Sequence, residues 1–147
     1  MSLLEQLSSD LKTAMKAKDK LRLAVIRSLK TALTNAKISA GQDLSSDEEL
    51  SVLSSQLKQR KDSLADFEKG DRADLAEQTK AEIEIVQAYL PEQLDEAAVV
   101  TIVDEAMQAT GATSKADFGK VMQYVMPKVK GRADGAMVNQ VVKSKLS

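Results

Sequence analysis

Apolar residues recur every three or four positions through the first ninety residues, which predicts helices that each bury one face. Leu7, Leu11 and Met15 form such a stripe near the N-terminus. A second stripe of leucines begins after Asp19, a residue that can cap a helix, and ends before Gly41, which can close one. We therefore expect two amphipathic helices before residue 41.

Two further helices are expected before Pro91. Ser45 and Ser46 each stand three positions before a glutamate, the spacing of a capping box at the start of a helix. We interpret Gly70 as the end of this third helix and Asp71 as the cap of a fourth. Pro91 lacks an amide hydrogen and disfavours helical geometry in the residue before it, so it predicts the end of the fourth helix.

After Pro91, β-branched residues and methionine replace leucine as the main apolar types, and the helices become shorter. Asp95, Ser114 and Asp134 each stand at the predicted start of a short helix. We therefore predict an all-α fold: a helical domain of four helices over residues 1–92 and a small three-helix domain over residues 93–147.

Composition removes most kinds of catalysis from consideration. The 147 residues are 43% apolar and include no Cys, His or Trp, which excludes disulfides, thiol or imidazole catalysis and Cys/His zinc sites. No glycine-rich nucleotide motif and no nucleophilic serine motif occurs. Acidic pairs such as Asp71 with Asp74 could hold Mg²⁺ or act as acid and base, although a solvated, salt-bridged face explains them more simply. We predict no catalytic residue, no metal and no cofactor.

The N-terminus and the hydropathy predict a cellular location. No run of 18 apolar residues occurs, and the first ten residues are acidic and amphipathic, unlike a signal peptide. We therefore expect a soluble, cytoplasmic protein that does not contact membranes.

A formal net charge of −1 conceals an uneven distribution. Residues 12–37 hold eight basic residues and one acidic residue, residues 38–114 hold six and seventeen, and residues 115–147 hold seven and two. Such asymmetry is typical of proteins that contact nucleic acids or membranes, and it also fits helices whose charged faces are merely solvated.

The most concentrated basic segment is the predicted turn at residues 126–135. Lys128, Lys130 and Arg132 surround Gly131, and a glycine turn that precedes a helix can approach a phosphate closely. The alternative is structural: Gly131 supplies a left-handed turn, Asp134 caps the next helix, and the cations stabilise the end of the preceding helix. The negative charge of Asp134 would also repel a phosphate at that helix start.

A second basic surface is predicted on the first two helices. It comprises Lys16, Lys18, Lys20, Arg22, Arg27 and Lys30. All four aromatic residues of the chain lie elsewhere, so base stacking is not expected there. If RNA binds this surface, we expect recognition of the backbone and of its shape.

Several separate motifs, in order along nearly the whole chain, resemble the YqeY family. They are Ala14–Leu23, Gln59–Ser63, Asp74–Ala76, Tyr89–Pro91, Gly119–Met122, Met126–Gly135 and Val138–Asn139. The C-terminal part is similar to the tail domain of GatB, a subunit of the glutamine-dependent amidotransferase that acts on mischarged tRNA. The resemblance implies a four-helix region followed by a small helical domain that contacts tRNA.

The same resemblance implies which residues would bind RNA. They are Lys120, Lys128, Lys130, Gly131, Arg132, Asn139 and Lys143. The family label is a carbon–nitrogen ligase with glutamine as amido donor, but the chain matches none of the catalytic parts of the amidotransferase. We therefore expect a non-catalytic or auxiliary tRNA-binding protein. The alternatives are the labelled ligase activity and an adaptor whose acidic middle helices dock a translation-related protein.

Overall fold

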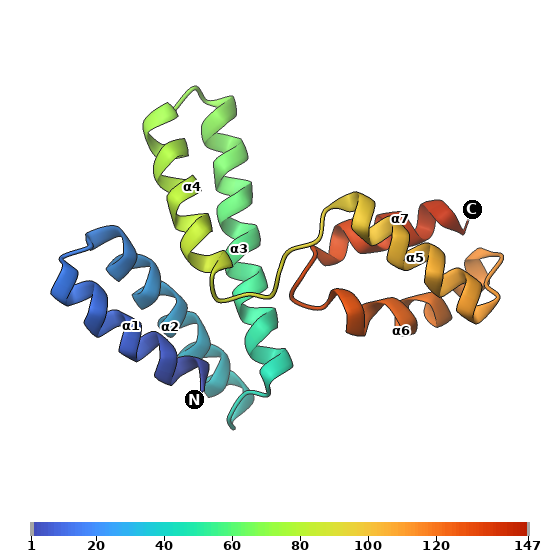
Figure 1. Cartoon of the computed structure of the whole chain (residues 1–147), viewed down its shortest axis with the longest axis horizontal. Coiled ribbons are helices and arrows are strands. Elements are labelled where there is room, and N and C mark those ends of the chain that lie inside the picture. The colour runs from blue at the N-terminus through green and yellow to red at the C-terminus, as the bar shows by residue number, and fades with distance from the viewer. Residues whose placement is uncertain (1, 147) are drawn as a thin grey trace. The chain divides into compact units, whose positions relative to one another are not determined.

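The computed structural model describes residues 2–146, and this part of the chain is all-α. The elements in chain order are α1 (Leu3–Ala17), α2 (Lys20–Ala40), α3 (Ser46–Lys69), α4 (Ala73–Gln87), α5 (Glu96–Thr110), a 3₁₀ turn η1 (Lys115–Asp117), α6 (Phe118–Val129) and α7 (Gly135–Lys145). The chain divides between Leu90 and Pro91 into two compact units, where the sequence placed the division between residues 92 and 93 (Figure 1).

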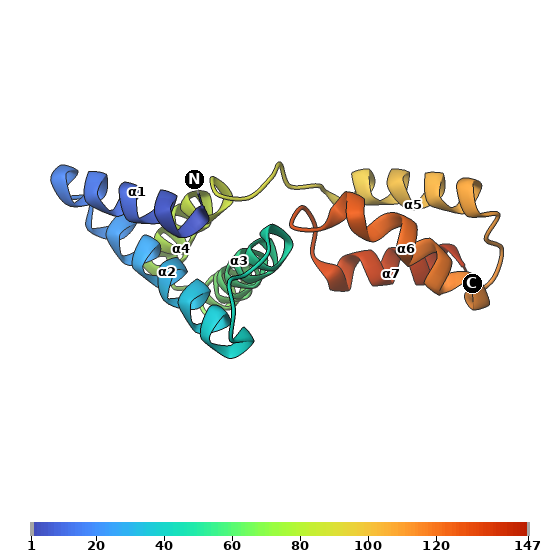
Figure 2. The same cartoon turned by 90° about the horizontal axis from the view of Figure 1, so that it is seen from below.

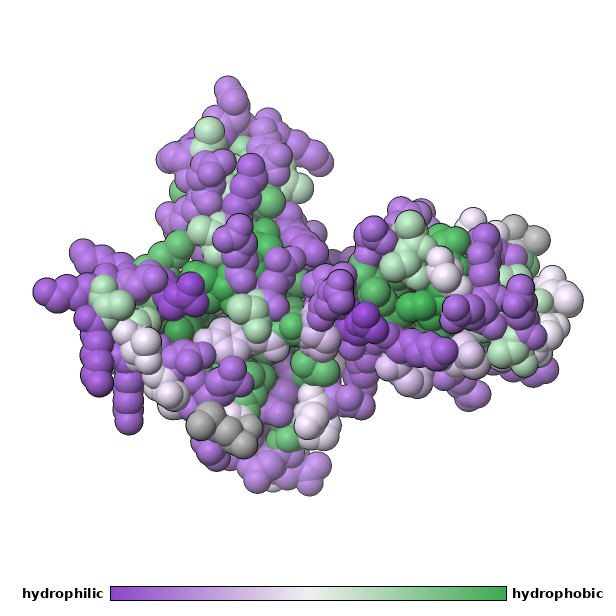
Figure 3. Space-filling view, in the orientation of Figure 1, coloured by the Kyte–Doolittle hydropathy of each residue, from purple (hydrophilic) through white to green (hydrophobic). Residues whose placement is uncertain are grey.

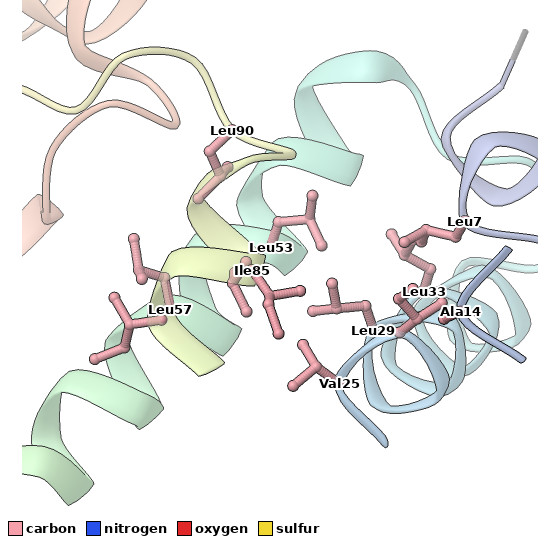
Figure 4. Packing of buried hydrophobic residues seen from close by; sticks show 12 residues of the cluster. Leu7, Ala14, Val25, Leu29, Leu33, Leu53, Leu57, Ile85 and Leu90 are labelled. Atoms are coloured by element: carbon pink, nitrogen blue, oxygen red, sulfur yellow. The ribbon is translucent and has the colours of Figure 1, made fainter. Parts of the chain in front are cut away.

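The first unit consists of two helical hairpins that share one apolar core. Helix α1 packs against α2 (Figure 2), α3 packs against α4, and α2 contacts both helices of the second hairpin. Figure 4 shows Leu29 of α2 near Leu53 of α3 and Ile85 of α4, and Leu33 of α2 beside Leu7 and Ala14 of α1. Helix α2 therefore buries most of its apolar face in the interior and exposes its polar face, with Ile38 near its end also exposed.

Several predicted helix ends are confirmed. The side chain of Asp19 accepts a hydrogen bond from the Arg22 amide, and Gly41 follows α2 with a φ of 70°. Ser45 and Glu48 form a reciprocal capping box at the start of α3. These ends were predictable because caps satisfy backbone groups that are local in sequence.

The junction between α3 and α4 differs from the prediction. Gly70 has a φ of −84°, whereas Asp71 has a φ of 59° and takes the left-handed conformation itself. Arg72 then precedes α4 without a side-chain cap. The assignment of Asp71 as the cap was wrong because aspartate tolerates the left-handed region, and here it makes the turn instead.

Two polar contacts join distant helices of the first unit. The Arg60 side chain of α3 is only 13% exposed; Nη2 lies 3.2 Å from Ser28 Oγ of α2, and Nε lies 3.5 Å from a Glu82 oxygen of α4. The Tyr89 hydroxyl, just after α4, donates to the Asp10 carboxylate of α1. Burial and this bond both raise the pKa of Tyr89 above its ordinary value.

The second unit is a small three-helix arrangement around a core rich in valine. Val99, Val103, Val121, Val125 and Val138 are fully buried in it. The predicted box of Ser114 and Asp117 caps η1, which leads directly into α6. Hydrogen bonds from the Thr113 and Ser114 amides hold the pKa of the Asp117 carboxyl below its usual value.

Candidate nucleic-acid interface

The turn between α6 and α7 contains the basic segment that the sequence singled out. Pro127 lies in the last turn of α6, which ends at Val129, and Gly131 follows, buried and with a φ of 73°. The side chain of Asp134 accepts a hydrogen bond from the Ala136 amide and caps α7. The conformation of Gly131 and the cap at Asp134 therefore agree with the structural alternative from the sequence, in which Gly131 supplies a left-handed turn and Asp134 caps the next helix.

Arg132 fastens this turn to the extended segment that precedes α5. Its Nε donates to the Glu92 carbonyl at 3.1 Å, and Nη1 donates to the Lys128 carbonyl at 3.4 Å. The Arg132 carbonyl in turn accepts from the Leu94 amide at 2.7 Å. The Gln93 side chain adds a 2.8 Å bond to the Gly131 carbonyl. The guanidinium group, which the sequence assigned to phosphate oxygens, thus also organises the turn.

The ammonium group of Lys128 lies against the side chain of Tyr124, one turn earlier in α6. The ammonium nitrogen lies 3.3 Å from the Tyr124 hydroxyl and 4.4 Å from the centre of the Tyr124 ring. Lys128 is exposed, so this cation–π contact orients the ammonium group without removing it from solvent. Lys130 is half-buried and caps α6.

The structure does not gather all seven predicted RNA-binding residues into one patch. Lys128, Lys130, Gly131 and Arg132 share the α6–α7 turn, whereas Lys143 lies near the other end of α7, about 12 Å along the helix from Gly135 at 1.5 Å per residue. Lys143 lines a pocket with Lys115, Phe118 and Leu146 at the start of α6. Two further predicted residues lie outside the turn: Lys120, whose ammonium group is 4.0 Å from Asp117, and exposed Asn139.

The second predicted basic surface lies on the α1–α2 hairpin. Lys16 and Lys20 are exposed, Lys18 ends α1 in the left-handed conformation, and Arg22 pairs with Asp19 at 3.4 Å. Arg27 and Lys30 line an open groove of about 440 Å³, together with Leu11, Thr31, Thr34 and Asn35. The sequence interpretation missed the two threonines and the asparagine, although their spacing on the helix was readable.

The acidic side chains form no metal centre in residues 2–146, which contain no group of three or more potential ligands. Asp74 pairs with Arg72 at 3.4 Å, and this contact lowers the pKa of the Asp74 carboxyl. No helix of the described residues is both long and apolar enough to cross a membrane. The visible face of each unit shows hydrophilic residues interspersed with hydrophobic ones (Figure 3).

Comparison with known proteins gives a family. Residues 4–146 match the family model described as Yqey-like protein. Among curated proteins, the chain is similar to "Altered inheritance of mitochondria protein 41, mitochondrial" of Lachancea thermotolerans, with 34% identity over 90% of this chain and 74% of the relative. The protein of the same name from Kluyveromyces lactis is 36% identical over 82% of this chain and 70% of its own length.

These relatives correct the predicted location. Their names are those of mitochondrial proteins, which contradicts the cytoplasmic prediction. The prediction was wrong because the observations behind it, no membrane-length apolar run and an N-terminus unlike a signal peptide, fit proteins of more than one aqueous compartment. These features therefore do not separate such compartments.

Proposed function

Because the chain belongs to the YqeY family, and because its C-terminal unit resembles the tRNA-contacting tail of GatB, we propose that it is a non-catalytic tRNA-binding protein. The α6–α7 turn is the contact surface, with Lys128, Lys130 and Arg132 facing the phosphate backbone. The partner is tRNA, and the binding needs no cofactor.

The observation that carries this proposal is the bracing of the turn. Arg132 and Gln93 tie residues 131 and 132 to the segment before α5 through three hydrogen bonds of 2.7–3.1 Å. Tyr124 holds the Lys128 ammonium group within 4.4 Å of its ring. A surface whose cations are ordered before binding loses less conformational entropy when it meets a phosphate backbone. The guanidinium N–H groups beyond the two that hold the turn remain as donors for phosphate oxygens.

A titration of the full chain with tRNA at two salt concentrations tests this function. Neutralised phosphates release counterions, so the affinity falls steeply as salt rises. The double variant Lys128→Ala with Lys130→Ala should lower the affinity and reduce the slope against salt by about two. The control is Lys61→Ala with Lys69→Ala, which removes the same charge from exposed positions of α3. Equal affinities for wild type and the turn variant would contradict the proposal.

The α3–α4 hairpin favours a second candidate, an adaptor for a basic translation-related protein. Residues 43–89 hold twelve acidic and six basic residues, and most of the acids are exposed. Pull-down with and without nuclease separates the two functions, because an association through RNA is lost when the RNA is digested. The family-label ligase has its own test: release of ammonia from glutamine that depends on aminoacyl-tRNA.

A further inference from the structure

The polar face of α2 carries a row of hydrogen-bond donors. The row consists of Arg27, Lys30, Thr31, Thr34 and Asn35, whose successive spacings of three, one, three and one residues place them on one side of the helix. Together with Leu11 of α1 they line the open groove of about 440 Å³. Two cations, two hydroxyl groups and an amide therefore share one concave surface.

These five polar residues have no partner within the part of the chain that the structure describes, residues 2–146. Two other cations of the same helix are paired, Arg22 with Asp19 at 3.4 Å and Lys37 with Asp43 at 2.9 Å. The contrast matters because exposed charges on helices are commonly balanced by acids one turn away. On this face of α2 the positive charge is left for a molecule from outside.

The acids of the α1–α2 hairpin do not offset that charge. Residues 2–40 include eight basic and three acidic residues. Two of the acids are engaged elsewhere, since Asp10 accepts from Tyr89 and Asp19 caps α2. The groove therefore lies on a hairpin with a marked positive excess, which attracts polyanions over several ångströms.

We propose that this groove binds the phosphodiester backbone of RNA and is a second contact, separate from the α6–α7 turn. Guanidinium, ammonium, hydroxyl and amide groups are the side-chain donors that contact phosphate and sugar oxygens. None of the groove residues is aromatic, so the contact is to the backbone and not to stacked bases. The inference rests on the proposed function for the identity of the ligand as RNA.

An anionic membrane is the other large polyanion that a basic helix could meet. A helix that lies on a membrane inserts an apolar face among the lipids. The apolar face of α2 is not available, because Val25, Ile26, Leu29 and Leu33 are at most 1% exposed in the core. A backbone of phosphates in water therefore fits this surface better than a lipid interface.

Residue-resolved NMR on the full chain of 15.9 kDa tests the two contacts separately. The isotope-labelled protein is titrated at low salt with an unmodified transcript of one tRNA. Shifts of the amides of residues 27–35 support the groove, and shifts at residues 128–132 support the turn. Shifts at the turn alone overturn this inference and leave the proposed turn surface standing; shifts at the groove alone do the reverse. No shift at either place overturns both.

A variant measures the contribution of the groove. Arg27→Gln with Lys30→Gln should weaken tRNA binding roughly tenfold at low salt and lower the slope of affinity against salt by about two, one per lost phosphate contact. The matched control, Lys61→Gln with Lys69→Gln, should change the affinity less than twofold. A groove variant that binds like this control overturns the inference. So does a wild-type protein that binds vesicles of anionic lipid but not the transcript.

Discussion

The α6–α7 turn and the α2 groove carry similar charge, and the protein uses that charge differently. In the turn, Arg132 donates to two backbone carbonyls and Lys128 rests against Tyr124. In the groove, Arg27 and Lys30 contact no described residue through a hydrogen bond or ion pair. The local density of Lys and Arg therefore does not measure how much charge a surface can offer to a ligand.

Arg60 extends this comparison to an arginine that is committed to the fold. Its guanidinium group contacts Ser28, Gln56 and Glu82 on three helices of the first unit. Arg132 is intermediate between Arg60 and Arg27 in its number of intramolecular partners. It stabilises a turn and keeps some N–H donors for a ligand. The number of intramolecular partners falls from Arg60 to Arg132 to Arg27. We therefore expect the effect of replacement on stability to fall in the same order, and the effect on RNA affinity to rise.

Replacement of Arg60 should destabilise the protein most. Arg60→Ala leaves Glu82 without its partner in a site where the Glu82 side chain is only 22% exposed, and it removes the hydrogen bond to Ser28 of α2. We expect the first unit to lose about 3 kcal/mol of unfolding free energy. Urea unfolding followed by NMR of amides in that unit measures it. Lys61→Ala, at the exposed neighbouring position, should change stability by less than about 0.5 kcal/mol.

Replacement of Arg132 should affect only the second unit. Arg132→Ala removes the bonds to the Glu92 and Lys128 carbonyls, and we expect a loss of about 2 kcal/mol in the amides of α5, α6 and α7. Arg132→Lys keeps the charge but cannot span both carbonyls, so it should recover part of the loss. Equal stability of wild type and Arg132→Ala would show that the bracing is not structural.

A substitution at Gly131 tests the turn without changing any charge. Gly131→Ala forces a side chain into a conformation with a φ of 73°, which should cost about 1 kcal/mol in the second unit. Gly119→Ala in α6 is the matched control, because nothing lies within 4 Å of its added carbon. In a helix that change should be neutral or stabilising. Urea unfolding of both variants compares them, and equal losses would contradict the assigned role of the turn.

The groove should contribute least to stability. Arg27→Gln with Lys30→Gln removes no intramolecular bond, so the unfolding free energy should change by less than about 0.5 kcal/mol. The same variant should bind tRNA more weakly, which separates a loss of contact from a loss of fold. A substantial destabilisation would mean that these cations have a structural role. It would contradict the proposed difference between the groove, whose cations do not stabilise the fold, and the turn, whose Arg132 does.

Much of the fold was predictable because its signals are local. The stripe of leucines in α2, the cap at Asp19 and the box at Ser45 depend on residues within a few positions, and the all-α prediction is confirmed. The cap at Asp71 was not predictable in the same way. Asp71 can cap a helix or adopt the left-handed conformation, and the local sequence is compatible with both; in the structure its φ is 59°.

The candidate sites also have features that the sequence predicts and features that depend on contacts between distant residues. The sequence by itself determined where basic residues concentrate and that helices carry them, because charge and periodicity are properties of the chain. Only the tertiary structure decided that Arg132 reaches the carbonyl of Glu92, forty positions away, and that Lys143 stands apart from the turn. Which cations have partners depends on distances between segments remote in sequence, and these distances exist only after the core has packed.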